Sequence, residues 1–338
     1  MVCRGKIRWG LVGCGDISRK RVVAAIQSST SCELLACIRR DSSRLEEFQS
    51  QYQIPKGYRS YSDFLADADI DAVYVATAVA LHCQQTVQAA EQGKHVLCEK
   101  PMAMNVSECR KMIEACRSNG VKLGVSYYRR FYPAILKIRE LLEDQVLGMP
   151  ILARTTLVEH AESAERRPLV WRFQPEGGGG GLLMDMVSHR LDVLVMLFGL
   201  PQSLAAYTTT RVLDIPVEDT ASLLLQYGSG LHVLVFGSHC VRMPMDEFEV
   251  FGTGGKLKIA PMNGPRLEVV TDHCEILDLP KADNVHLPLI EDFNRAIRED
   301  SQPRVSGEVG MAASIILEAA YRSAKSGKVV EIAEIQAH

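Results

Sequence analysis

The sequence predicts an α/β protein with two domains. Residues 1–124 are expected to form a doubly wound parallel sheet, and residues 125–338 an α+β domain with a large, mostly antiparallel open sheet. Strand-like and helical segments alternate in the first region, whereas strand-like segments follow one another through glycine-bearing turns after Pro150. A chain of 338 residues, 47% of them hydrophobic, can bury two cores of this kind.

The first region is expected to contain five buried strands with helices between them. The expected strands are residues 7–12, 33–38, 71–77, 95–98 and 122–126. The expected helices are residues 19–26, 43–51, 61–65, 82–91 and 107–119. Ligands of such sheets bind beyond the carboxyl ends of the strands, where Gly13, Arg39, Thr77 and Lys100 fall.

The second region has a different pattern of segments. The expected strands are residues 151–159, 204–211, 221–227, 231–238, 247–252, 256–259 and 329–332. Helices are expected at residues 132–144, 183–198, 289–299 and 309–326. Sequential strands favour an antiparallel or mixed open sheet over a second nucleotide fold.

Composition limits the partners. A net charge of −3 and 23% charged residues without a basic tract argue against nucleic acid as a partner. No apolar run is long enough to span a bilayer, and the first residues lack the apolar core of a signal peptide, so we expect a cytoplasmic protein without membrane contact. The ten cysteines form no C-x-x-C pair, which predicts reduced thiols rather than disulfides or zinc.

A glycine turn follows the first expected strand, with Gly13, Cys14, Gly15, Asp16 and Ile17 between strand and helix. Gly13 permits a tight turn, and Gly15 lets backbone N–H groups approach a pyrophosphate at the helix N-terminus. Ser18 takes the place of the third glycine and is small enough for close helix–strand packing. The pattern predicts a Rossmann NAD(P) site, although such turns also bind S-adenosylmethionine, a flavin or nothing.

The second expected strand is followed by Arg39, Arg40 and Arg44. Sheets specific for NAD usually place an acid there for the ribose 2′-OH, whereas a guanidinium suits a 2′-phosphate. The sequence therefore favours NADP(H), with NAD(H) possible. The alternative is a pair of surface arginines with Asp41 still reaching the ribose.

The segment Glu99-Lys100-Pro101 stands at the carboxyl end of a buried strand. Lysine is unusual there unless it donates to a ligand, and beside a cationic nicotinamide its pKa should fall, which suits proton transfer. Pro101 is a candidate cis proline that directs the lysine toward the cleft. The alternative is a structural lysine paired with Glu99.

On the helix after the glycine run 177–181, Asp185, His189 and Asp192 occur at i, i+4 and i+7, within about 60° of one another. His189 is a candidate acid/base that Asp185 orients, although a lone helical histidine is more often structural. We expect the glycine run to permit close approach to a ligand. Metal binding by these three residues is not expected, because no further ligand cluster accompanies them.

The sequence resembles the glucose–fructose oxidoreductase, inositol dehydrogenase and MocA-like (Gfo/Idh/MocA) family. The matching segments are GLVGCGDIS at 10–18, GKHVLCEKPMA at 93–103, YYRRFYP at 127–133, WR at 171–172, GGGGLLMDMVSHRLD at 178–192 and residues 305–330. The likeness spans essentially the whole chain and is nearest to sugar enzymes of the 1,5-anhydro-D-fructose reductase and D-xylose dehydrogenase types. The E-K-P and D-x-x-x-H motifs are more specific evidence for this resemblance than the glycine turn.

The resemblance implies roles for individual residues. Lys100 and His189 would handle the proton, with Asp185 beside them. Further residues would surround the cofactor, namely Thr77, Leu81, His82, Glu99, Lys100, Ser126, Trp171 and Arg172. Tyr128, Arg130, Asp185 and His189 would border the substrate.

Together these observations predict an NADP(H)-dependent oxidoreductase that acts on a sugar, a polyol or a related hydroxyl or carbonyl compound. A homodimer or homotetramer through the second sheet is expected. Two alternatives remain, a cofactor-binding regulator without net redox chemistry and a glycosidase that uses tightly bound NAD(H).

Overall fold

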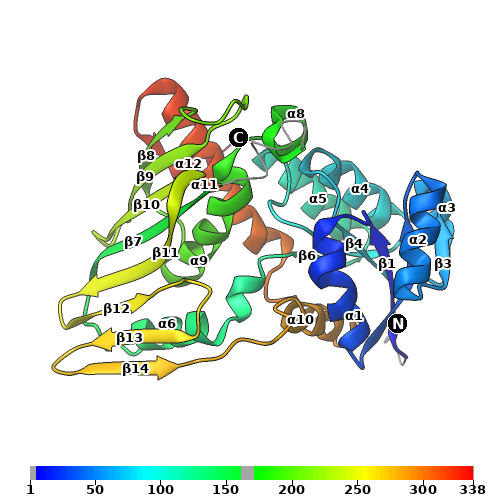
Figure 1. Cartoon of the computed structure of the whole chain (residues 1–338), viewed down its shortest axis with the longest axis horizontal. Helices are drawn as coiled ribbons and strands as arrows, with labels where there is room; N and C mark the ends of the chain where they lie inside the picture. The colour runs from blue at the N-terminus through cyan, green and yellow to red at the C-terminus, as the bar shows by residue number, and fades with distance from the viewer. Residues whose placement is uncertain (1–4, 161–170, 338) are drawn as a thin grey trace. The chain divides into compact units, whose positions relative to one another are not determined.

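The computed structural model describes residues 5–160 and 171–337, which divide into two compact units (Figure 1). One unit contains residues 1–128 and 282–311, and the other contains residues 129–281 and 312–338. Residues 282–311 therefore return to the first unit after the second has begun. The expected domain boundary between residues 124 and 125 remains a prediction.

The first unit is built on a six-stranded parallel sheet, which confirms the predicted doubly wound fold. Its strands, in their order across the sheet, are β3 (Lys56–Tyr58), β2 (Cys32–Ile38), β1 (Ile7–Val12), β4 (Ala72–Val75), β5 (His95–Cys98) and β6 (Leu123–Val125). The sequence did not predict the short edge strand β3. Strands β1 and β4 are buried almost throughout, as expected for strands that are covered on both faces.

Helices alternate with these strands. They are η1 (Ser18–Val22), α1 (Val23–Ser28), α2 (Ser42–Tyr52), α3 (Tyr61–Ala66), α4 (Val79–Glu91), α5 (Val106–Ser118) and the returning α10 (Leu287–Arg298). Helix α10 belongs to the core of this unit. Phe293 lies 5.6 Å from the Trp9 ring, centroid to centroid, and the Trp9 indole donates to Asn294 Oδ1 at 3.0 Å.

The second unit has a nine-stranded mixed sheet, as predicted. Its strands, in order, are β14 (Cys274–Asp278), β13 (Arg266–Val270), β12 (Gly255–Ile259), β11 (Cys240–Gly252), β7 (Pro150–His160), β10 (His232–Ser238), β9 (Thr220–Gln226), β8 (Ser203–Thr209) and β15 (Val330–Glu331). Strands β7 and β10 run parallel, and the other described pairs are antiparallel. The sequence did not predict β13 and β14.

Among the described residues, β9 and β10 in the middle of this sheet have one buried face and one exposed face. Burial alternates along β9 and β10, as it does when alternate side chains face a core and solvent. The helical segments of this unit are α6 (Pro133–Glu143), η3 (Trp171–Phe173), α8 (Pro175–Gly178), η4 (Leu183–Val187), α9 (Ser188–Phe198), most of α11 (Gly307–Ser326) and α12 (Ile332–Gln336).

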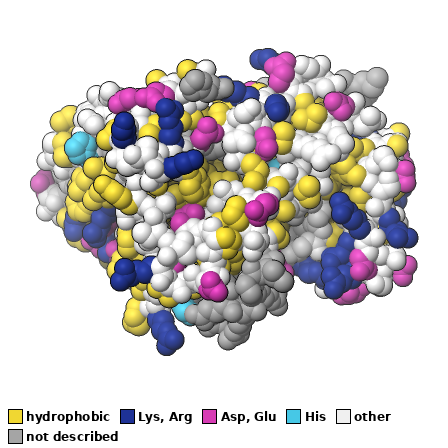
Figure 2. Space-filling view, turned by 90° about the horizontal axis from the view of Figure 1, so that it is seen from above, with side chains coloured by type: hydrophobic (Ala, Val, Ile, Leu, Met, Phe, Trp, Pro, Cys, Tyr) yellow, Lys and Arg dark blue, Asp and Glu magenta, His cyan; other side chains and the backbone are white. Residues whose placement is uncertain are grey.

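Four further observations concern partners. The nine cysteines within the described residues are free thiols, and Cys3 lies outside that range. In the described ranges, no group of three or more His, Cys, Asp or Glu side chains is arranged to hold a metal ion, and no helix is both long and apolar enough to cross a membrane. On the face shown in Figure 2, Lys and Arg side chains lie among Asp and Glu side chains rather than forming a continuous basic surface.

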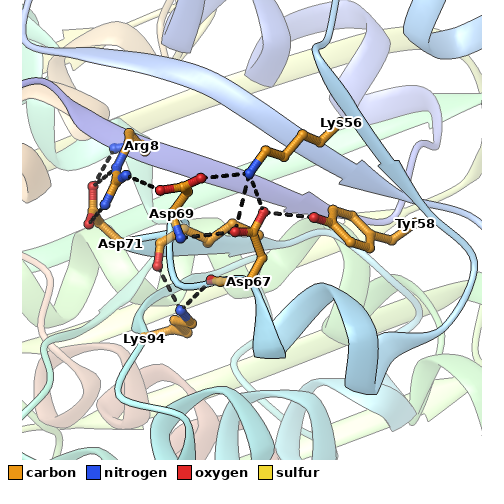
Figure 3. A network of polar contacts seen from close by, with 8 residues as sticks. Arg8, Lys56, Tyr58, Asp67, Asp69, Asp71 and Lys94 are labelled. Atoms are coloured by element: carbon orange, nitrogen blue, oxygen red, sulfur yellow. Dashed lines mark hydrogen bonds and ion pairs between the residues drawn. The ribbon is translucent and has the colours of Figure 1, made fainter.

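The amino ends of the parallel strands are held by a polar network (Figure 3). Arg8 binds both oxygens of Asp71, and Lys56 binds Asp67 and Asp69. Burial raises the pKa of Asp67, but hydrogen bonds from Tyr58 and Lys56 outweigh it and bring the pKa to about 2. This network fixes the end of the sheet that lies away from the glycine turn.

Lys94 is the buried member of this network. It is 6% exposed, and its ammonium group donates to the backbone carbonyls of Asp67 at 2.8 Å and Ile70 at 2.9 Å. We predict that Lys94→Met lowers the free energy of unfolding by about 2 kcal/mol, because two buried carbonyls lose a charged donor. Urea unfolding measures this change. The exposed Lys111→Met is the control, and an equal loss in both variants would contradict the prediction.

Candidate active site

The glycine turn after β1 has the geometry that a phosphate site requires. Gly13 has φ of +99°, and an added Cβ would lie 2.6 Å from the Ala76 carbonyl oxygen, so a side chain is excluded. Ser18 is buried and its hydroxyl donates to the Gly13 carbonyl at 2.6 Å. At Gly15 an added Cβ would meet no protein atom within 4 Å. The turn is therefore fixed from the protein side and accessible at Gly15, which fits a bound pyrophosphate.

The residues after β2 are arranged around the same turn. Arg39 donates from Nη1 to the Cys14 carbonyl at 3.0 Å. Asp41 is the N-cap of α2 and accepts hydrogen bonds from the Arg44 N–H at 3.0 Å and the Ser43 hydroxyl at 2.9 Å. These bonds lower the pKa of Asp41. The carboxylate that could have bound a ribose thus caps a helix, while a guanidinium faces the glycine turn.

After β4 the chain is tied to the Lys100–Pro101 turn. The His82 ring is 1% exposed and lies between the carbonyl oxygens of Thr77, at 3.2 Å, and Pro101, at 3.1 Å. Burial lowers the pKa of His82, although these carbonyl groups raise it. The Thr77 hydroxyl donates to Gln85 Oε1 at 2.6 Å. In this structure the His82 side chain joins two backbone turns, and the predicted contact of Thr77, Leu81 and His82 with a cofactor remains a prediction.

Glu99 is buried at the end of β5 and accepts several hydrogen bonds. Its donors are the Tyr74 hydroxyl at 2.7 Å, the Ser126 hydroxyl at 3.3 Å and the backbone N–H of Lys100 at 3.1 Å. His286 Nε2 lies 3.6 Å from the same carboxylate. Burial raises the pKa of Glu99, but His286, Tyr74 and Lys100 outweigh it and bring it to about 2.

The peptide bond between Lys100 and Pro101 is cis, as the sequence suggested. Lys100 is half-buried and follows Glu99, so the carboxylate that binds its N–H fixes the backbone from which the lysine extends. Sequence reasoning missed His286, which precedes α10 and is brought to Glu99 only by the return of residues 282–311. No spacing or motif around His286 indicates this pairing.

In the second unit, Asp185 lies in the π-helical turn η4 and His189 in the first turn of α9. The start of η4 is held by Glu218, whose buried carboxylate accepts the N–H groups of Gly181 at 3.0 Å and Leu183 at 2.9 Å. The Tyr321 hydroxyl donates to the same carboxylate at 2.8 Å. A carboxylate at a helix N-terminus satisfies free N–H groups and interacts favourably with the helix dipole.

The glycine run before η4 packs closely against other parts of its own unit, and the expected approach of a ligand remains a prediction. An added Cβ at Gly180 would lie 1.9 Å from the Tyr321 hydroxyl, and one at Gly181 would lie 2.2 Å from the Glu218 carbonyl. At Gly178 the obstacle is the Arg172 backbone, at 2.8 Å. The glycines allow close packing against protein atoms, so they are not evidence for a ligand.

Two arginines flank this helix. Arg130 donates from Nε to both oxygens of Asp192 at 2.9 Å, and both side chains are buried. Arg172 lies over Trp171, with its guanidinium carbon 5.0 Å from the ring centroid, and its Nε is 4.0 Å from Asp185 Oδ1. Asp192, which shares the predicted polar stripe with His189, is thus neutralised by Arg130. Contact of Arg130 with substrate and of Trp171 and Arg172 with cofactor remain predictions.

Comparison with known proteins agrees with this arrangement. Residues 7–127 match the GFO_IDH_MocA oxidoreductase family with an NAD-binding Rossmann fold, and residues 135–258 match the GFO/IDH/MocA C-terminal domain. The chain belongs to the Gfo/Idh/MocA family. It is an NAD(P)-dependent oxidoreductase, as its sequence predicted.

Individual relatives cover nearly the whole chain. The 1,5-anhydro-D-fructose reductase of Ensifer adhaerens is 31% identical over 96% of this chain and 98% of its own. A D-xylose 1-dehydrogenase (NADP(+)) of Haloferax volcanii is 28% identical over 96% and 99%. Among solved structures, the aldose-aldose oxidoreductase of Caulobacter crescentus, complexed with glycerol, has a TM-score of 0.89 and 27% identity and covers 96% of this chain and 99% of its own.

The low pKa of Glu99 predicts a pH dependence of stability. Because its folded-state pKa, about 2, lies below the ordinary value of 4.5, its contribution is present above pH 4.5 and is lost as the pH falls toward 2. We expect Glu99→Gln to reduce the slope of unfolding free energy against pH in this window by up to about 1.4 kcal/mol per pH unit. Urea unfolding at several pH values measures the slope, and an unchanged slope would contradict the assignment.

Proposed function

We propose that this protein transfers hydride between NADP(H) and a sugar, a polyol or a related hydroxyl or carbonyl compound. The observation that carries the proposal is the Glu99–Lys100 turn at the carboxyl ends of the parallel strands, the edge that also carries the glycine turn. When bound, the nicotinamide supplies the hydride acceptor or donor. The names of relatives that act on anhydrofructose and xylose support a sugar substrate.

The preference for NADP(H) rests on the residues after β2. Arg39 lies against the glycine turn, and Arg40 and Arg44 follow within one helical turn. Asp41, the residue most able to bind a ribose hydroxyl, is used as the N-cap of α2. A guanidinium binds phosphate through two parallel N–H groups, so this arrangement favours a 2′-phosphate over a free 2′-OH.

The proton of the substrate hydroxyl requires an acid/base. We assign this role to Lys100 and His189, with Asp185 orienting the histidine. Glu99 fixes the backbone of Lys100, and Glu218 fixes the start of the segment that carries Asp185 and His189. Tyr128 and Arg130 are proposed to border the substrate. A regulator without redox chemistry would not need all three groups, and the relatives' names favour net oxidation or reduction over glycoside cleavage.

The open face of the second sheet supports self-association. Leu224 and Leu234 lie opposite each other on β9 and β10 and are 45% and 44% exposed, and Phe236 and Tyr207 are 42% and 74% exposed. Contiguous exposed apolar side chains of this kind mark interaction surfaces. We propose that a second copy covers this face in a homodimer or homotetramer.

The catalytic assignment predicts a large loss of turnover. In Lys100→Met and in His189→Asn, kcat on a substrate found with a sugar and polyol panel should fall at least about 100-fold, because a positioned acid/base is removed. The dissociation constant for NADP⁺, measured by fluorescence, tests whether the cofactor site survives. Lys111→Met is the matched control, and normal turnover in either site variant would refute the mechanism.

The cofactor assignment predicts a change in specificity. Arg39→Ala should raise the dissociation constant for NADP⁺ about 10- to 100-fold, because a charged hydrogen-bonded partner contributes about 1.5 to 3 kcal/mol. Binding of NAD⁺ should change much less. Arg117→Ala, an exposed arginine on α5 of the same unit, serves as the control. Equal weakening of both cofactors would show that Arg39 does not recognise the 2′-phosphate.

A further inference from the structure

A row of side chains, buried except for the half-buried Arg21, joins Glu99 to the helix that follows the glycine turn. His286 Nε2 lies 3.6 Å from Glu99 Oε1, and the His286 and Tyr128 rings are 4.6 Å apart, centroid to centroid. On the other side, the Arg21 guanidinium carbon lies 5.3 Å from the Tyr128 ring centroid. The row thus runs from a carboxylate at the end of β5 to an arginine of η1.

The side chain of Asn284, in the returning segment 282–311, connects Arg21 and His286 within this row. The Asn284 side-chain amide donates to the Arg21 carbonyl at 2.9 Å, and its Oδ1 accepts the His286 N–H at 3.0 Å. Asn284 therefore holds η1 and His286 at the same time. The backbone of His286 is thus held relative to η1, the first helix after the glycine turn.

His286 has an unusual environment for a buried imidazole. It is 0% exposed, and neither ring nitrogen makes a hydrogen bond with a described residue. A buried polar group without a hydrogen bond is costly unless another interaction compensates. The Glu99 carboxylate lies beside the ring, with Oε1 3.6 Å from Nε2, and the imidazole favours the charged form of the carboxylate and so lowers the pKa of Glu99.

We propose that His286 is a positioning residue that holds the Glu99 carboxylate in place. Through Glu99 it fixes the Glu99–Lys100 turn relative to η1, the helix that follows the glycine turn. The proposal rests on the assigned role of Lys100, because positioning matters for turnover only if Lys100 takes part. Arg21 and Tyr128 complete the row on the side of η1. When His286 is replaced, the buried charge of Glu99 loses one of the groups that stabilise it. The Glu99–Lys100 turn is then held less firmly.

Other ionisable groups around Glu99 must be considered in any titration. They are Tyr74 on β4, Cys98 on β5, Lys100, and His82 on α4. Burial raises the pKa of Tyr74 and of Cys98, so both stay neutral in acid. Burial lowers the pKa of His82. A change in the titration of Glu99 after replacement of His286 is therefore assigned to His286.

The test uses His286→Phe, which keeps a ring beside Tyr128 but removes both nitrogens. Carboxyl ¹³C NMR follows Glu99, and Glu99→Gln identifies its signal. The pKa of Glu99 should rise by about one pH unit or more, because burial is then less opposed. We expect kcat to fall about 10- to 100-fold with little change in KM, since small misplacements of a reacting group have effects of this size.

The control is Asn294→Leu on α10, which loses the bonds of Asn294 to Trp9 and Ser31 and does not touch Glu99. It should lower the melting temperature without moving the Glu99 titration. An unchanged titration in His286→Phe would overturn the proposal. If that variant fails to fold, His286→Gln must give the upward shift instead. Normal turnover in Lys100→Met would refute the proposed function, while the Glu99 titration would still report on His286.

Discussion

The structure of the first unit depends on the buried carboxylate of Glu99. A buried charge is tolerated only when it is hydrogen-bonded and compensated, and Glu99 receives partners from β4, from the turn after β6 and from the segment before α10. These elements lie far apart in the sequence. These elements are therefore fixed around the Glu99 carboxylate. The backbone of Lys100 is fixed there too, because its own N–H is one of the donors.

The second unit uses the same device. Glu218 accepts two N–H groups at the start of η4 and the hydroxyl of Tyr321 from α11. In both units a buried glutamate accepts backbone N–H groups, one from Lys100 at Glu99 and two at Glu218, that are close in sequence to the residues proposed for proton transfer. The backbone next to these proposed residues is thus fixed by hydrogen bonds, the kind of support that holds a functional side chain in one geometry.

Sequence reasoning was most successful where the signal is local. The parallel sheet, the glycine turn and the cis Lys100–Pro101 bond follow from periodicity, glycine spacing and proline. It failed where distant segments meet. The return of His286 to Glu99 has no local pattern, and β13 and β14 have only five residues each, with no burial alternation along β14. The glycine run 177–181 could not be assigned from sequence, because a tight protein contact and an approach to a ligand require the same residue.

The return of residues 282–311 to the first unit also has a consequence for biosynthesis. Trp9 packs on Phe293 and donates to Asn294, so strand β1 lacks part of its surroundings until residues 282–311, which follow β14 in the chain, have been translated. Domains generally fold as units, and the N-terminal one folds first during synthesis. Here the first unit is completed only by helix α10, which follows strands β7 to β14 in the chain, so the Trp9 side chain lacks its partners until that helix has been made.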